Sequence, residues 1–172
     1  MNMKTCGIIT EYNPFHQGHI YHIKKTKELT QCDCLIVIVS NHFTQRGLFS
    51  LLTMEDKTKL ALEAGCNLVI ELPPCYAAQS ADYFAKYAVE SLSQLHIDQI
   101  CFGSETNNIS TLKEYSKQME STQVVPSLSM NQNLYTKNIR PNDILGIQYI
   151  KQCEKYGITP YTIARNDSFK SA

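Results

Sequence analysis

Two histidines near the N-terminus, His16 and His19, have the spacing and surroundings of a phosphate-binding turn. Gly18 lies between them, and Pro14 restricts the chain just before them. An apolar strand-like run precedes this turn and a helical pattern follows it. The start of a helix offers free backbone N–H groups and the positive end of the helix dipole, which suit a phosphate. Imidazole donors can stabilise charge that develops on that phosphate, so the stretch predicts a nucleotide site.

Two other interpretations of the histidine pair stay open at this point. The rings could form hydrogen bonds at the start of the helix without binding any ligand. A metal site has less support, because His-x-x-His supplies two ligands and no third is obvious nearby. His22 continues the same spacing but is expected to lie deeper, against the sheet. The spacing of Cys32 and Cys34 fits neither a zinc pair nor a redox pair, so no metal site or disulfide framework is predicted.

The elements that must position these residues follow a regular rhythm of strand and helix. Most of the apolar runs are continuous, as in strands that are covered on both faces. This alternation predicts right-handed βαβ units, and therefore an α/β fold with a Rossmann-like parallel sheet flanked by helices. The expected strands are residues 5–10, 34–40, 67–72, 99–102 and 159–164, and the expected helices are residues 19–29, 54–64, 80–95, 109–119 and 142–157.

Ligands of such sheets bind beyond the carboxyl ends of the strands, so the loops after the strands are the places to search. The first loop is the histidine stretch, and the next three are residues 40–47, 71–74 and 102–105. Residues 121–141 break the rhythm, because they are polar and have no clear period. We expect them to form a long irregular stretch inside a single domain that covers residues 1–172.

The composition is that of an ordinary globular protein. Hydrophobic residues make up 43% and charged residues 19% of the chain, and the formal net charge is zero. This neutrality gives no global field that would favour nucleic acid or an anionic membrane. Neither a signal peptide nor a run long enough to span a bilayer is visible, so a cytoplasmic location without a membrane partner is expected.

The first turn also resembles the signature of a known superfamily. Residues 7–19 contain H-x-G-H, the mark of the nucleotidyltransferase superfamily, in the wider context Asn13-Pro14-Phe15-His16. More narrowly, the chain resembles the bacterial tRNA(Met) cytidine acetate ligase family. Further motifs carry this resemblance in order along nearly the whole chain: residues 40–47, 68–73, 102–105, 141–146 and 160–165.

The resemblance implies a HIGH-type nucleotidyltransferase fold and a reaction in two steps. Members of the family activate acetate with ATP, giving acetyl-adenylate and pyrophosphate. They then transfer the acetyl group to the wobble cytidine of elongator tRNA(Met), forming N4-acetylcytidine. ATP would normally bring Mg²⁺, for which no dedicated carboxylate cage is visible.

Carried onto this chain, the resemblance implies that His16 and His19 are catalytic. The expected ATP-binding residues are Ile9, Thr10, Glu11, Tyr12, Asn13, Pro14, Phe15, His16, Gln17, Gly18, His19, Ile20, Tyr21, His22, Gly103, Asn142 and Arg165.

Five positions outside the first turn have individual expectations. Gly103, expected just after the fourth strand, would leave room for adenine or ribose. Asn142 could cap its helix, contact the nucleotide, or do both. The guanidinium groups of Arg165 and Arg46 suit phosphate, and Arg46 is also a candidate for acetate. Glu71 is expected to order loops rather than to act as a base, because acetate is already ionised.

Three features depart from the family pattern. Its members are typically longer, with a helical C-terminal part that helps to engage tRNA, and this chain ends where a Ser/Lys-rich loop that assists pyrophosphate release would begin. Residues 117–141 are short beside the family. Leu48-Phe49-Ser50 stand where the family usually has an acidic residue and a proline. Because a tRNA-binding surface normally carries excess Lys and Arg, we expect tRNA to bind mainly to residues absent here.

Two competing functions stay open beside the ligase. A small-molecule adenylyltransferase, acting on phosphopantetheine or a mononucleotide, would share H-x-G-H and this chain's size. Such families lack the Asn-Pro-Phe-His and Pro-Asn-Asp-Ile-Leu-Gly contexts that occur here. A truncated nucleotide-binding module without turnover is the other alternative.

Overall fold

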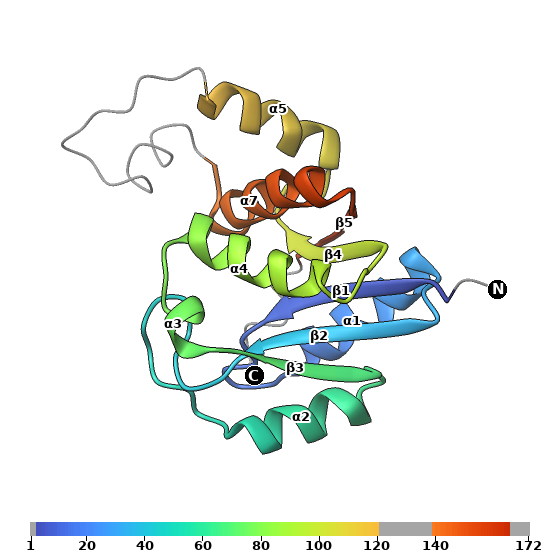
Figure 1. Cartoon of the computed structure of the whole chain (residues 1–172), viewed down its shortest axis with the longest axis vertical. Helices are drawn as coiled ribbons and strands as arrows, with labels where there is room; N and C mark the ends of the chain where they lie inside the picture. Colours follow the sequence, from blue (N-terminus) through green and yellow to red (C-terminus); the bar gives the residue numbers. More distant parts are fainter. Residues whose placement is uncertain (1–2, 121–138, 166–172) are drawn as a thin grey trace.

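The computed structural model describes residues 3–120 and 139–165, which form a parallel sheet covered by helices on both faces (Figure 1). The strand order is β3-β2-β1-β4-β5, so the chain starts in the middle of the sheet and winds outwards in both directions. The strands are β1 (Thr5–Thr10), β2 (Cys34–Ser40), β3 (Leu68–Leu72), β4 (Gln99–Ser104) and β5 (Thr159–Ala164). The predicted Rossmann-like α/β class is confirmed.

The helices occupy two layers, one on each face of the sheet. In Figure 1, α4, α5 and α7 lie on one face, and α1 and α2 lie on the other. The helices are α1 (Gln17–Thr30), α2 (Met54–Glu63), α3 (Pro74–Ala77), α4 (Ala81–Ser93), α5 (Ile109–Glu120) and α7 (Pro141–Tyr156). None of the described helices is long and apolar enough to cross a membrane.

Several expected boundaries were wrong, for local physical reasons. The apolar pattern of the fourth strand ends at Phe102, but backbone pairing with β5 continues to Ser104, so Gly103 lies inside β4 and not after it. Asn142 does not cap α7, because Arg140 occupies the N-cap position and Pro141 the first turn. Ser80 precedes α4 as predicted, but its hydroxyl donates to the Asp82 carboxylate and makes no cap bond.

The remaining differences concern short or polar segments. The one-turn helix α3 was not predicted, because four residues cannot show a helical period. Of the expected irregular stretch 121–141, residues 121–138 lie outside the described residues. Pro141 already belongs to α7, so the stretch ends earlier than expected.

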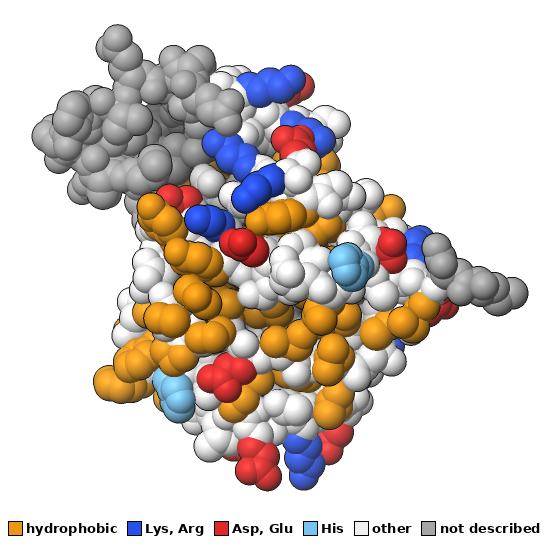
Figure 2. Space-filling model, viewed as in Figure 1, with side chains coloured by type: hydrophobic (Ala, Val, Ile, Leu, Met, Phe, Trp, Pro, Cys, Tyr) orange, Lys and Arg blue, Asp and Glu red, His pale blue; other side chains and the backbone are white. Residues whose placement is uncertain are grey.

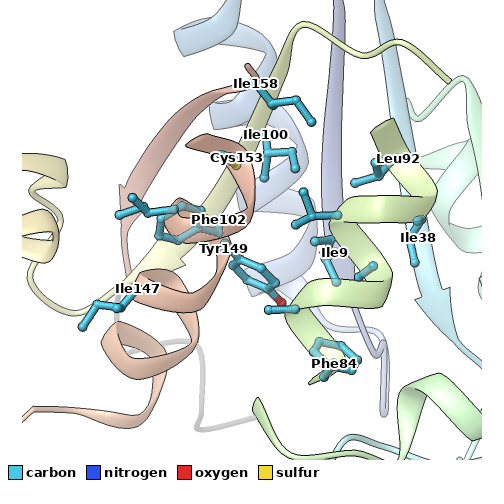
Figure 3. Packing of buried hydrophobic residues seen from close by; sticks show 14 of the residues in the cluster. Ile9, Ile38, Phe84, Leu92, Ile100, Phe102, Ile147, Tyr149, Cys153 and Ile158 are labelled. Carbon is cyan, nitrogen blue, oxygen red and sulfur yellow. The ribbon is translucent and has the colours of Figure 1, made fainter. Parts of the chain in front are cut away.

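The larger core fills the space between the sheet and the layer of α4 and α7. Figure 3 shows Phe84 and Leu92 of α4 and Tyr149 of α7 converging on Ile9 and Ile100 of the sheet. A second cluster lies between the sheet and the layer of α1 and α2. Three strand-associated cysteines, Cys6, Cys66 and Cys101, are buried in it as free thiols. The interpretation of these cysteines as small buried hydrophobes is confirmed.

Gly146 sets how closely α7 approaches the sheet. A methyl group at Gly146 would stand 2.6 Å from Cε2 of Phe102, a distance that requires the ring or the helix to move. Phe102 and Tyr149 also pack together, with ring centroids 5.6 Å apart. The close approach of α7 therefore depends on the missing side chain at Gly146.

We predict that Gly146→Ala lowers the free energy of unfolding by about 1–3 kcal/mol, because overlap with Phe102 outweighs the gain in helix propensity. Urea unfolding measures the change. Adding Phe102→Leu should restore part of the loss, since the smaller side chain relieves the overlap. A Gly146→Ala protein more stable than the parent would contradict the close contact.

Candidate nucleotide-binding site

A cavity of about 820 Å³ opens at the carboxyl edge of the sheet. The parallel strands place the loops after β1 and β2 and the ends of β4 and β5 at this edge, and the start of α7 completes the wall. Of the seventeen residues expected to bind ATP, fourteen line the cavity; Phe15, Gln17 and Ile20 do not. Arg46 lines it as well. Residues that lie far apart in the sequence and were expected to share one site therefore line the same cavity.

The two histidines cap the N-terminus of α1 with their own rings. His16 is the N-cap residue, and its Nδ1 accepts a hydrogen bond from the Gly18 backbone N–H at 3.0 Å. The His16 backbone N–H in turn donates to Nδ1 of His19 at 3.2 Å. This is a capping box built from two imidazoles in place of the usual hydroxyl and carboxylate. The histidine rings thus do form hydrogen bonds at the start of the helix, as one of the interpretations of the sequence expected.

This arrangement fixes the proton on each ring. A backbone N–H can only donate, so Nδ1 of both rings must be the unprotonated acceptor. In the neutral imidazole the proton then sits on Nε2. Both His16 and His19 line the cavity, and Nε2–H is the N–H group that remains on each ring. Their ring centroids lie 3.9 Å apart, which brings the two donors close together.

The surroundings keep the three histidines of this turn neutral. Burial lowers the pKa of His19 to about 3, and His16, His22 and Arg165 add to the effect. The pKa of His16 is also lowered, first by desolvation and then by Arg165. For His22, burial lowers the pKa to about 4, and its Nε2 has no hydrogen-bond partner among residues 3–120 and 139–165. His22 lies deep in the wall, as predicted from its spacing.

Tyr12 packs against the histidine turn from the protein core. It is 1% exposed, adopts a left-handed φ of 48°, and packs edge-on against His19 with ring centroids 4.8 Å apart. The Phe15 ring packs against the rings of Tyr12 and His19, with centroid distances of 4.7 Å and 5.5 Å. Phe15 thus belongs to the support of the turn, whereas Gln17 is exposed at the first position of α1. A strained backbone held by burial is a feature of functional turns.

A second polar chain crosses the cavity from β4 to β5. Glu105 accepts from Nδ2 of Asn142 at 2.5 Å and from the Asp143 backbone N–H at 3.1 Å. Asn142 Oδ1 accepts from Nη1 of Arg165 at 2.6 Å. Glu105 therefore fixes the amide orientation of Asn142, and Asn142 aims Arg165. Sequence reasoning quoted Glu105 only as part of a motif and gave it no role, because its partners are distant in the chain.

Two motif residues hold the loop that carries Arg46. Glu11 accepts from the Gln45 backbone N–H at 2.6 Å. Asn13 accepts from the Leu51 N–H at 2.6 Å and donates to the Phe49 carbonyl at 3.1 Å. Both residues were expected to contact ATP, and both also fasten residues 43–51 over the cavity.

Lys57 fixes the base of the same loop and was missed by sequence reasoning. It is 1% exposed, and its ammonium donates to the carbonyls of Ser40 at 2.7 Å and Asn41 at 3.2 Å. Burial lowers its pKa, while the charges of Glu11 and Glu71 oppose that shift. Glu71 accepts from the Asn41 side chain at 3.0 Å, in line with the loop-ordering role expected for it. The only sign of a buried Lys57 in the sequence was its position on the face of α2 that also carries the buried Ala61.

The opposite wall of the cavity is apolar. It comprises Phe84 of α4, Phe102 of β4 and three residues of α7, Ile144, Leu145 and Tyr149. Sequence analysis assigned these residues to the core, which is also correct, since four of them are buried. Gly103 lies beside this wall, where an added methyl group would meet only the Arg165 side chain at 3.9 Å. The cavity thus combines an apolar surface suited to a base with polar donors suited to phosphates.

Among residues 3–120 and 139–165, no group of three or more His, Cys, Asp or Glu side chains is arranged to hold a metal ion. The guanidinium groups of Arg46 and Arg165 and the N–H groups of the imidazoles around the cavity can donate hydrogen bonds to an anion.

The fold, the histidine turn and the anion-binding donors define a nucleotide-binding α/β protein of the HIGH nucleotidyltransferase class. The model of the family described as HIGH Nucleotidyl Transferase matches residues 3–171, so the chain belongs to that family.

Within this class the chain is similar to tRNA(Met) cytidine acetate ligases. It is 42% identical to that protein of Clostridium novyi (strain NT) over 193 residues, covering 96% of this chain and 48% of the relative. With the Bacillus subtilis (strain 168) protein the identity is 36%, covering 96% and 46%. The chain thus spans about half the length of these relatives. The alignment with the first is longer than the 172 residues of the chain, so the relative carries extra residues within the shared region.

A solved structure supports the same placement. Thermotoga maritima TmcAL bound with alpha-thio ATP matches with a TM-score of 0.86 at 31% identity, covering 96% of this chain and 47% of that one.

We predict that His19 and His22 stay neutral at every pH from 8 down to 5, because their pKa values are lowered to about 3 and 4. Two-dimensional ¹H–¹⁵N NMR of the imidazoles should show the Nε2–H tautomer for His19 throughout this range. Chemically unfolded protein is the control, where imidazoles titrate near 6.5. Since the unfolded chain takes up protons that the folded chain refuses, these groups should lower stability as pH falls from about 6.5 towards 3. Titration of His19 near pH 6.5 in folded protein would contradict the assignment.

Proposed function

We propose that this chain is the nucleotide-activating part of a tRNA(Met) cytidine acetate ligase. It would use ATP to convert acetate to acetyl-adenylate and pass the acetyl group to the wobble cytidine of elongator tRNA(Met). The observation that carries this proposal is the pair of cavity-lining imidazoles whose Nδ1 atoms accept backbone N–H groups, which leaves Nε2–H as the donor on each ring. The relatives named tRNA(Met) cytidine acetate ligase and the neighbour bound with alpha-thio ATP support the substrate assignment.

The donors around the cavity suit the first step. An acetate oxygen attacks the α-phosphorus, a new P–O bond forms, and the bond to pyrophosphate breaks with its electron pair going to the leaving oxygen. Positioning and charge stabilisation dominate such transfers. We assign His16 and His19 to the phosphate oxygens where charge increases, and Arg165, aimed by Asn142, to the polyphosphate. Arg46 reaches the cavity from the loop after β2 and is assigned to phosphate or acetate.

The second step transfers the acetyl group to the acceptor. The cytidine amine attacks the acetyl carbon, the amine loses a proton, and AMP leaves with the electrons of the acyl–oxygen bond. Mg²⁺ would enter with the ATP phosphates, because the described residues offer anion ligands and no carboxylate cage. We assign the base of ATP to the apolar wall beside Gly103 and its phosphates to the start of α1, because these parts of the cavity suit them chemically.

The two alternatives have less support. A small-molecule adenylyltransferase is disfavoured, because the relatives that cover 95–96% of this chain carry the name of the ligase. An inactive nucleotide-binding module has no structural feature in its favour, since both histidines line the cavity and keep an Nε2–H donor.

We predict acetate-dependent exchange of pyrophosphate into ATP, because the cavity holds the groups for adenylation but the step reverses when no RNA is present. Radiolabelled pyrophosphate measures the rate. Phosphopantetheine and nicotinamide mononucleotide serve as control acceptors. Exchange with a phosphorylated acceptor and none with acetate would overturn the ligase, and ATP binding without any exchange would identify an inactive module.

A matched pair of substitutions can separate the two roles of the second histidine. His19→Asn keeps an oxygen near Nδ1 that can cap His16, but it loses the donor to the cavity. His19→Gln keeps an amide donor near Nε2 and loses the cap. We expect His19→Asn to lower exchange by about 10²–10³-fold with little loss of ATP affinity, as on removing a transition-state donor. His19→Gln should retain more activity but unfold more easily. Equal losses of binding and rate in His19→Asn would mean that His19 binds only the ground state.

A further inference from the structure

Three tyrosines form an exposed stack beside the cavity that the proposed adenylation step does not use. Tyr87 of α4 stacks on Tyr76 of α3 with ring centroids 4.3 Å apart and an angle of 28° between the rings. Tyr83, one turn earlier in α4, lies 6.2 Å from Tyr87 at 25°. Tyr83 is 49% and Tyr76 38% exposed, whereas Tyr87 is partly buried between them. We call these three residues the tyrosine stack.

The tyrosine stack lies at the same edge of the sheet as the cavity. α3 follows the carboxyl end of β3, and Ala81 and Phe84, on either side of Tyr83 in the sequence, both line the cavity. The loop that carries Arg46 is tied to this region, because the Gln45 side chain donates to the Gln79 carbonyl at 2.5 Å. Figure 2 shows hydrophobic side chains gathered over α3 and the start of α4. The stack therefore lies close to the cavity, although none of its three rings lines it.

The chemistry of the stack fits an aromatic partner better than an aliphatic one. The nearly parallel rings of the stack are partly exposed, and a further flat ring can stack on such a surface. Stacking of a base on an aromatic side chain depends little on which base it is. Lys86 places its ammonium 5.3 Å from the centre of the Tyr87 ring, which supplies a positive charge beside the stack. A lysine next to exposed aromatic rings is the combination that holds a single-stranded backbone while its bases stack.

We propose that the tyrosine stack binds unpaired bases of the acceptor RNA and guides the reacting base towards the cavity. This inference rests on the proposed function, since it takes the acceptor to be RNA. Stacking on the tyrosines would give the chain an affinity for RNA that its zero formal net charge does not provide. Stacking does not require a large basic surface, so a chain with zero formal charge can still hold a looped-out strand at the stack.

The chain offers a matched control at the other end of the sheet. Lys155 places its ammonium 4.8 Å from the centre of the Tyr156 ring. This pair has the same lysine–tyrosine chemistry but lies at the end of α7, just before β5 begins, at the amino edge. Neither Tyr156 nor the tyrosine stack lines the cavity, so the two lysine–tyrosine pairs differ in lying at opposite edges of the sheet. Substitution of Tyr156 therefore tests whether any tyrosine beside a lysine would suffice.

The test compares binding of a hairpin RNA with an unpaired loop and of a blunt duplex with the same stem. The chain contains ten tyrosines and no tryptophan, so quenching of tyrosine fluorescence reports stacking directly. We expect the hairpin to bind and to quench, and Tyr83→Ser to weaken hairpin affinity about 10-fold. Tyr83→Phe should retain affinity, because the ring is kept, and Tyr156→Ser should bind as the parent does. Thermal unfolding checks that each variant is folded.

Several outcomes would overturn the proposal. They are absence of hairpin binding by the parent, equal affinity for hairpin and duplex, and equal losses in Tyr83→Ser and Tyr156→Ser. A Tyr83→Ser variant that binds RNA normally but changes its oligomeric state would assign the stack to a protein interface instead. Acetate-dependent exchange by the parent, measured without RNA, keeps this result separate from the proposed function. If the parent shows acetate-dependent pyrophosphate exchange but Tyr83→Ser binds RNA as the parent does, only the role of the stack is rejected. If the parent shows no exchange, the proposed adenylation is rejected.

Discussion

The site depends on one constraint, the donation of two backbone N–H groups to the imidazoles of His16 and His19. These N–H groups belong to the first turn of α1, where a helix leaves its donors without internal partners. Because Nδ1 of each ring accepts one of these N–H groups, the bonds cap the helix and also fix the neutral ring as the Nε2–H tautomer. The same bonds that start α1 therefore leave Nε2–H as the donor on each cavity-lining ring. Burial and the nearby Arg165 then keep the pKa of both rings low.

The loops around this turn are held by polar contacts that do not touch the reacting atoms. Glu11 and Asn13 fasten the loop after β2, and the buried Lys57 binds the carbonyls at its base. On the other side, Glu105 orients Asn142, and Asn142 orients Arg165. Each contact joins segments that lie at least sixteen residues apart. The parallel sheet makes this possible, because it brings the carboxyl ends of all five strands to one edge.

The sequence predicted the parts of this arrangement that have a local signature. Continuous apolar runs located the strands, and H-x-G-H at a strand-to-helix junction located the cavity. Asn142 and Gly103 were placed less well, because helix capping and strand pairing depend on partners elsewhere in the fold. Glu105 stood in a motif and Lys57 on a helical stripe, but neither pattern indicated what the side chain does. Their roles follow from hydrogen bonds to residues that become neighbours only on folding.

Neutral donors are well matched to a reaction between two anions. Acetate and the polyphosphate repel each other, and a fixed cation at the histidine turn would bind both ground states as strongly as the transition state. A preorganised Nε2–H responds chiefly to charge that increases as the leaving oxygen separates. Arg165 can then supply the constant attraction that holds the phosphates. In the proposed reaction, Arg165, just after β5, would supply a constant charge and the histidines at the start of α1 would supply neutral donors. Arg165 also helps to lower the pKa of both histidines.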